Sequence, residues 1–131
     1  MIGFDVNILF FLSIIVDSIT VGPFQENTFI LWEKELRSAL LVDPGDNPDE
    51  IISKIRILDL VPAAIINTHA HLDHVGAVYK IKDEFSIPFY LHKDEKKILE
   101  HYPEMCRMFG MKPYEIPTVD NWISGDGEIK I

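Results

Sequence analysis

The 131-residue sequence contains a single cysteine, Cys106, and is poor in basic residues. One cysteine excludes an intrachain disulfide and a cysteine-based metal knuckle. Twelve Lys and Arg residues stand against 21 Asp and Glu residues, which gives a formal net charge of −9. No basic run or interleaved aromatic stripe offsets this charge, so the composition argues against a nucleic-acid partner. The acidic excess is interpreted as a contribution to solubility.

Long apolar runs, internal repeats and low-complexity tracts are also missing. The most apolar stretch, ILFFLSIIV at 8–16, is too short to span a bilayer. The residues before it carry Asp5 and no Lys or Arg, and no small-x-small cleavage site follows closely, so an export signal is the less favoured alternative. We therefore predict a buried strand in this region, no membrane association and a cytoplasmic location, which the single cysteine also suits.

The length and the balance of 47% apolar against 25% charged residues fit one globular domain with an ordinary core. Short apolar runs predict strands in part of 8–21 and at 27–32, 38–43, 63–68 and 88–92, followed by a strand, a Gly-Asp-Gly turn and a second strand over 122–131. Apolar spacing predicts helices over 48–59, 75–85 and 93–102, with 103–118 irregular, either an apolar loop or a broken helix. This order of elements is typical of a mixed α/β protein.

The start of the first predicted helix has a recognisable pattern. Asn47 suits the N-cap, Pro48 suits the first helical position, and Glu50 suits the third. Together they predict a capping box, in which the Asn47 side chain caps the helix.

The segment NTHAHLDHVG, residues 67–76, holds three of the five histidines and an aspartate within six positions. It follows a predicted buried strand, at the sheet edge where open α/β folds place their sites. Extended residues two apart point the same way, so His69 and His71 can converge, and Asp73 and His74 can face a second point one turn on. A structural alternative is that these side chains cap the helix and hydrogen-bond the loop. The spacing favours metal binding, and imidazole and carboxylate ligands suit zinc, and equally iron or manganese.

The motif His69-Ala70-His71-Leu72-Asp73-His74 resembles the H-x-H-x-D-H signature of the metallo-β-lactamase-fold hydrolases. The resemblance covers about residues 16–131, and the subgroup that looks most similar is that of the glyoxalase II (hydroxyacylglutathione hydrolase)-like enzymes. It implies an αββα sandwich, here apparently truncated after its N-terminal half. Residues 1–15 precede the resemblance and are interpreted as an N-terminal extension or an extra strand. The further segments that carry the resemblance are VGPFQENTFIL (21–31), LLVDPGD (40–46), IPFYLH (87–92) and GDGEIKI (125–131).

The resemblance implies that His69 and His71 bind one metal ion and that Asp73 and His74 bind another. Asp73 is also the catalytic residue that it implies, and Asp43 lies in a position that supports the ligands from behind. Turn formation is nearly as good an explanation of Asp43. The remaining ligands of the family come after the point where this chain stops, which leaves two protein ligands for each metal.

Three further residues are potential ligands that we interpret otherwise. His92 at a strand end and His101 on a polar helix are expected to have surface or core roles. Cys106 is expected to be a buried apolar residue.

The predicted function is metal-dependent hydrolysis of a thioester or ester, with one or two zinc ions and iron or manganese as alternatives. A glutathione thioester is the substrate that the resemblance suggests. Two other functions remain open. One is the single-iron oxygen chemistry of the persulfide dioxygenases, which share the fold, and the other is a non-catalytic metal-binding or interaction role. An uncovered sheet face and edge also predict self-association.

Overall fold

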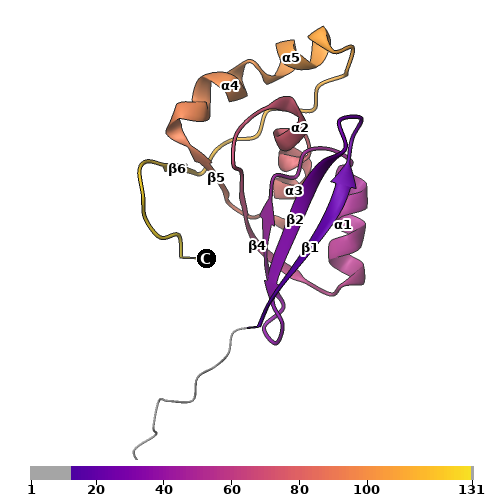
Figure 1. The fold of residues 1–131 in the computed structure, drawn as a ribbon, viewed down its shortest axis with the longest axis vertical. Helices are drawn as coiled ribbons and strands as arrows, with labels where there is room; N and C mark the ends of the chain where they lie inside the picture. Colours follow the sequence, from indigo (N-terminus) through magenta and orange to yellow (C-terminus); the bar gives the residue numbers. More distant parts are fainter. Residues whose placement is uncertain (1–12, 131) are drawn as a thin grey trace, which may run out of the picture.

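The computed structural model describes residues 13–130, which form one six-stranded sheet with helices against it (Figure 1). The sheet order follows the chain order, β1-β2-β3-β4-β5-β6. The strands are β1 (Ile14–Val21), β2 (Glu26–Glu33), β3 (Ser38–Val42), β4 (Val61–Ile66), β5 (Phe89–His92) and β6 (Asn121–Ile123). The helices are α1 (Pro48–Ile57), α2 (Leu72–Val75), α3 (Val78–Phe85), the 3-10 turn η1 (Lys93–Glu95), α4 (Lys96–Glu100) and α5 (Tyr102–Met108).

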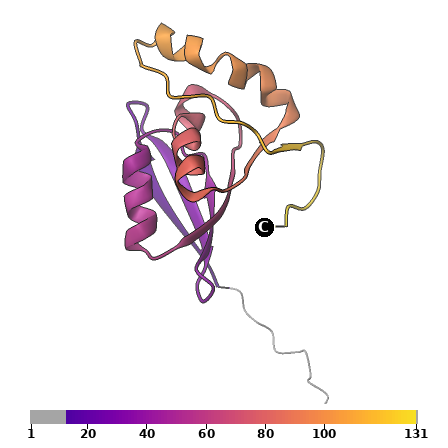
Figure 2. The ribbon, with the colours of Figure 1, turned by 180° about the vertical axis from the view of Figure 1, so that it is seen from behind.

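The direction of pairing changes at the middle of the sheet. The first three strands pair antiparallel through two hairpins, whereas β3, β4, β5 and β6 pair parallel. The parallel pairs need crossovers, and α1 and α3 provide two of them on the same side of the sheet. Figure 2 shows both helices in front of the strands. The carboxyl ends of β3 and β4 therefore lie side by side at the same end of the sheet.

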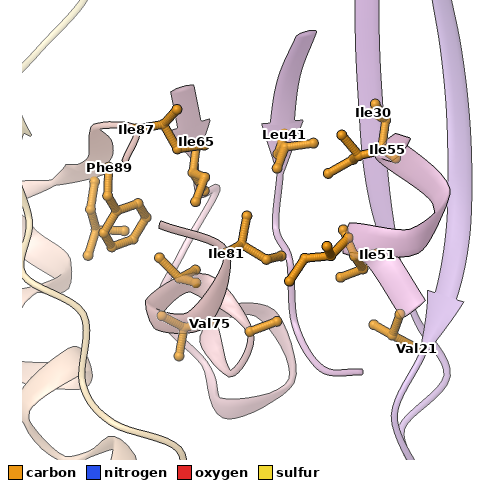
Figure 3. Packing of buried hydrophobic residues seen from close by; sticks show 14 of the residues in the cluster. Val21, Ile30, Leu41, Ile51, Ile55, Ile65, Val75, Ile81, Ile87 and Phe89 are labelled. Carbon is orange, nitrogen blue, oxygen red and sulfur yellow. The ribbon is translucent and has the colours of Figure 1, made fainter. Parts of the chain in front are cut away.

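The hydrophobic core lies between the sheet and the two crossover helices (Figure 3). The helices contribute Ile51 and Ile55 from α1 and Ile81 from α3, all fully buried. Side chains two apart on the strands meet them, because alternate residues of a strand share a face. These strand residues are Ile30, Leu41, Ile65 and Phe89.

The opposite face of the sheet is also apolar but remains open to solvent. Ile14 is 55% exposed, Val16 is 59% exposed and Phe29 is 39% exposed. Farther along this face, Leu31 and Leu40 line a shallow hollow with Ile14. We call this surface, defined by these five residues, the open face.

The structure confirms the mixed α/β class predicted from the sequence, and the described residues provide one sheet with its helices, one half of an αββα arrangement. The strands at 27–32, 38–43, 63–68 and 88–92 and the helices at 48–59 and 75–85 are present within a few residues of the predicted bounds. β1 begins at Ile14, so the first two of its residues belong to the segment interpreted as an extension. The remainder of that prediction, over 1–12, lies outside the described residues. No described helix is long and apolar enough to cross a membrane.

Two local predictions are corrected, and a third is narrowed to one of its alternatives. Asn47 does precede α1 and Pro48 does open it, but Asn47 has a left-handed backbone and its side chain makes no cap. Its Oδ1 instead accepts a hydrogen bond of 2.7 Å from the Gly22 N–H, because the first hairpin lies against this loop. Residues 103–118, predicted as an apolar loop or a broken helix, begin with the short helix α5 and then continue without regular structure, so the broken-helix alternative holds. Residues 124–130 form no strand after β6, and Ile131 lies outside the described residues.

Candidate metal centre

Two parallel strands bring the polar cluster together. β4 ends at Ile66, and the loop that follows carries the histidine motif into α2, while β3 ends beside it at Val42. The Asp43 N–H donates to the Ile66 carbonyl at 3.3 Å, which continues the pairing with β4 one residue past the end of β3. Asp43 therefore reaches the histidine loop although 26 positions separate it from His69.

The histidine rings lie against one another. The ring centroids of His69 and His74 are 4.0 Å apart, and those of His69 and His71 are 4.6 Å apart. Asp73 joins them, since its Oδ2 lies 3.6 Å from His74 Nε2. His71 has an extended backbone immediately before α2, whereas Asp73 and His74 lie within this short helix. The structure thus brings all four predicted ligands to the same end of the sheet.

Asp43 lies behind this cluster, and its carboxylate is fully engaged. Its Oδ1 accepts a hydrogen bond from the Thr68 N–H at 2.7 Å, and its Oδ2 accepts one from the Thr68 hydroxyl at 2.6 Å. The same Oδ2 lies 3.1 Å from His74 Nδ1. Asp43 is buried and has a left-handed backbone with φ of 52°, and its carbonyl accepts from the Thr28 hydroxyl at 2.9 Å. The side chain therefore contacts both Thr68 and His74, and the role of Asp43 in supporting a metal ligand stays a prediction.

The hydrogen-bond network assigns the tautomers of two histidines. A carboxylate only accepts, so His74 Nδ1 carries the hydrogen that faces Asp43, and Nε2 keeps its lone pair. The Thr68 hydroxyl donates to Asp43, so its oxygen accepts from His69 Nδ1 at 2.8 Å, and His69 Nε2 is likewise free. Burial, followed by the charges of His74 and His71, lowers the pKa of His69 and favours its neutral form. Neutral imidazoles with an oriented free nitrogen are the form that binds metals.

Donor atoms of Asp43, His69 and His74 all lie within 4.8 Å of one another. This trio differs from the ligand pairs implied by the motif, because Asp43 takes the place of Asp73 and His71 is left out. The oxygens of Asp43 already hold Thr68 and His74, so its chemistry fits an orienting group better than a ligand. His71 and Asp73 border the trio, and together the side chains offer the nitrogen and oxygen donors that zinc, iron and manganese accept. The residues present therefore fit a metal ion.

A buried glutamate was missed from the sequence. Glu26 is 8% exposed, its Oε1 lies 3.5 Å from His74 Nδ1, and its Oε2 has no hydrogen-bond partner among the described residues. Burial first, and then the charges of Asp43 and Asp73, raise the pKa of Glu26 to about 8. The available signal was its place on the inward face of β2, where it alternates with Thr28 and Ile30.

Two other polar side chains hold the main chain of the motif, and neither was predicted. Asn67 Nδ2 donates to the His74 carbonyl at 2.8 Å and to the His69 carbonyl at 3.3 Å. Glu95, from η1, accepts a hydrogen bond from the Ala70 N–H at 3.0 Å. Asn67 lies within the conspicuous motif, but no local pattern marks Glu95, which is 25 positions away from Ala70.

Close backbone packing completes the centre. A Cβ atom on Gly45 would lie 1.8 Å from the Asp73 carbonyl oxygen, and one on Gly76 would lie 2.3 Å from the Gly45 carbonyl oxygen. Both distances are impossible, so glycine is required at both positions for the DPG loop to reach α2.

His92, His101 and Cys106 lie apart from this cluster. The ring of His92 accepts from the Asp94 N–H at 3.2 Å, His101 is exposed, and Cys106 is buried in the core.

Imidazoles and carboxylates gathered at the ends of parallel strands, in the H-x-H-x-D-H order, are the arrangement that the resemblance to the metallo-β-lactamase-fold hydrolases implies. Residues 21–130 match the model of the metallo-beta-lactamase superfamily, and the chain belongs to this family. This confirms the resemblance inferred from the motif.

Several known proteins are similar to this chain. It is 34% identical over 115 residues to the hydroxyacylglutathione hydrolase GloC of Haemophilus influenzae, covering 87% of this chain and 54% of that protein. Among solved structures, the BLEG-1 B3 metallo-beta-lactamase has a TM-score of 0.80 at 32% identity, with 89% of this chain and 56% of that chain covered. TTHA1623, solved in a di-iron-bound form, has a TM-score of 0.79 at 31% identity, with 86% and 56% covered. The chain spans about half the length of the curated relatives it matches.

Proposed function

We propose that this chain carries the ligand half of a metal-dependent hydrolase that cleaves thioester or ester bonds. The single observation that carries the proposal is the orientation of His69 and His74, whose Nδ1 atoms are held by Thr68 and Asp43 so that both Nε2 atoms are free. In this proposal, as the family resemblance implies, His69 and His71 hold one metal ion and Asp73 and His74 hold another. Zinc is the proposed metal, with iron or manganese as alternatives.

A bound metal ion in such a site lowers the pKa of water and polarises the carbonyl that is to be cleaved. The chain's own residues prepare the site for it. Asp43 holds the Nδ1 hydrogen of His74, which fixes the ring and increases its basicity as a ligand. Asp73 contributes a negative charge beside His74 Nε2, where a cation would be stabilised.

The proposed substrate class is a thioester, and S-lactoylglutathione is the first compound to test. The similarity to a hydroxyacylglutathione hydrolase supports this choice. Because the chain spans about half of that relative, we expect turnover by the 131 residues alone to be low. Two protein ligands for each metal are fewer than the three usual for a catalytic zinc.

Iron-dependent oxygen chemistry is the second candidate function. The relative solved in a di-iron-bound form supports a test of iron at this site. A cytoplasmic location stays a prediction, as does the non-catalytic role.

We also propose that a second copy of the chain associates through the open face. Five apolar side chains define this surface, and burial of their apolar area favours the contact, although Glu33 borders the same hollow and each copy carries a net charge of −9.

The test is to load the chain separately with zinc, manganese and, without oxygen, ferrous iron. Uptake is measured by metal analysis, thioester cleavage by thiol release and oxygen use by an electrode. Metal uptake that is lost in His69→Ala and His74→Ala, but kept in the His101→Ala control, is expected. Thiol release with any loaded metal supports hydrolysis, and oxygen consumption with iron alone supports the second candidate. Equal uptake by all variants would refute the centre.

A further inference from the structure

Glu95 lies close to the candidate centre without belonging to the motif. It is the last residue of η1, the turn that follows β5 at the same end of the sheet as the histidine loop. The ring of His92 caps this turn by accepting the Asp94 N–H at 3.2 Å. This cap fixes where η1 begins and so directs Glu95 toward residues 69–71.

The carboxylate of Glu95 contacts the main chain of the motif at its centre. Its Oε2 accepts the Ala70 N–H at 3.0 Å, and Ala70 is fully buried. Ala70 is the residue between His69 and His71, and its N–H belongs to the His69–Ala70 peptide, so this hydrogen bond fixes the tilt of that peptide. Because alternate residues of an extended segment share a direction, this tilt decides whether both rings face the same point.

Other main-chain N–H and carbonyl groups of the motif form hydrogen bonds with different side chains. Asp43 holds the Thr68 N–H, and Asn67 holds the carbonyls of His69 and His74. Glu95 holds the N–H side of the His69–Ala70 peptide, whose carbonyl side Asn67 holds, and it comes from a separate element. It precedes α4, yet its side chain makes no cap for that helix. Its hydrogen bond therefore serves the histidine loop rather than its own helix.

We propose that Glu95 is a positioning residue, which aligns His69 and His71 for metal binding through the Ala70 N–H. The proposal rests on the metal centre proposed above. A charge-assisted hydrogen bond to a buried N–H is stronger than a neutral one, which suits a loop that must hold two rings in one orientation. A loss of such outer partners typically lowers metal affinity by roughly 10- to 100-fold.

The experiment compares the 131-residue chain with Glu95→Ala and Glu95→Gln, and uses Glu100→Ala as the matched control. Glu100 is an exposed carboxylate on α4, five residues on. Three quantities are measured: zinc affinity by competition with a chelator, amide hydrogen exchange of Ala70 without metal, and urea unfolding in the presence of chelator.

We expect Glu95→Ala to bind zinc roughly 10- to 100-fold more weakly and to exchange the Ala70 amide faster. Glu95→Gln retains an oxygen acceptor, so it should recover most of the affinity and of the amide protection. Glu100→Ala should match the unmodified chain. Urea unfolding in chelator should stay cooperative in all three, with a loss of stability in Glu95→Ala alone because the buried Ala70 N–H loses its acceptor, which separates positioning of the ligands from loss of the fold.

Three outcomes would overturn the proposal. Unchanged affinity in Glu95→Ala would remove any role of Glu95, while the metal centre itself would stand. Glu95→Gln as weak as Glu95→Ala, with the Ala70 amide still protected, would make Glu95 a ligand or a source of charge instead. No zinc uptake by the unmodified chain would refute the proposed centre, and this role with it.

Discussion

The two faces of the sheet differ in what covers them more than in what they are made of. On β2, Ile30 points to the helices and is fully buried, whereas its neighbour Phe29 points to the open face and is 39% exposed. A sheet with one solvated face usually alternates apolar and polar residues. Here the open face also carries large apolar side chains, beside polar ones such as Ser18 and Asn27, and such apolar residues are typical of a sheet that packs on both sides. The strands are therefore suited to apolar packing on both faces of the sheet. Among the described residues, only the face toward α1 and α3 is packed.

Substitutions on the covered face are expected to have the largest effect. Phe89 is fully buried against the helices, so Phe89→Ala should lower the free energy of unfolding by about 3–5 kcal/mol. Phe29→Ala removes the same atoms from the open face and should cost far less, because much of that ring is already in water. Urea unfolding of the two variants measures the difference. Similar losses would mean that the open face is covered in solution.

The next effect concerns the strand ends, which belong to neither face. His74→Ala should weaken zinc binding more than the roughly 10- to 100-fold loss typical of an outer partner, because a ligand itself is removed. Stability in chelator should change little, since the side chain lies at the edge of the core. Calorimetric titration with zinc checks the first point and urea unfolding checks the second. A large loss of stability without metal would indicate that the cluster is structural.

A pH-dependent effect is expected from Glu26. Its folded pKa is raised from 4.5 to about 8, mainly by burial, so the folded state prefers the protonated acid. Stability from this residue is complete below about pH 4.5 and is lost as the pH rises through about 8. Glu26→Gln should therefore gain stability relative to the unmodified chain between pH 5 and pH 8, by at most about 1.4 kcal/mol per pH unit. Urea unfolding in chelator across this range measures it, and a constant difference would contradict the assignment.

The smallest effect on stability is expected on the open face. Phe29→Glu should change the free energy of unfolding by about 0.5 kcal/mol or little more, as an exposed substitution usually does. It should nevertheless disperse self-associated chains, because like charges would then face one another. Light scattering after size-exclusion chromatography measures the mass. Phe109→Glu is the control, since that ring is 61% exposed and lies beyond α5. If the unmodified chain is monomeric at high concentration, the proposed association through the open face is refuted.

Short-range sequence patterns predicted most of the strands and helices and the histidine motif. Strand runs, the two crossover helices and the H-x-H-x-D-H motif were all predicted, because each depends on residues a few positions apart. The motif also carried the family, which residues 21–130 confirm. Local preference was insufficient at Asn47, whose side chain holds Gly22 across the fold, and at 124–130, where alternation alone produced no strand.

The tertiary structure alone decided how the motif is held. Parallel pairing of β3 with β4 brings Asp43 to His74, and the turn after β5 brings Glu95 to Ala70. Burial in the folded chain raises the pKa of the Glu26 carboxyl, although its sequence neighbours are ordinary strand residues. Such contacts join residues 25 or more positions apart. They depend on strand register and helix packing, which no local pattern contains.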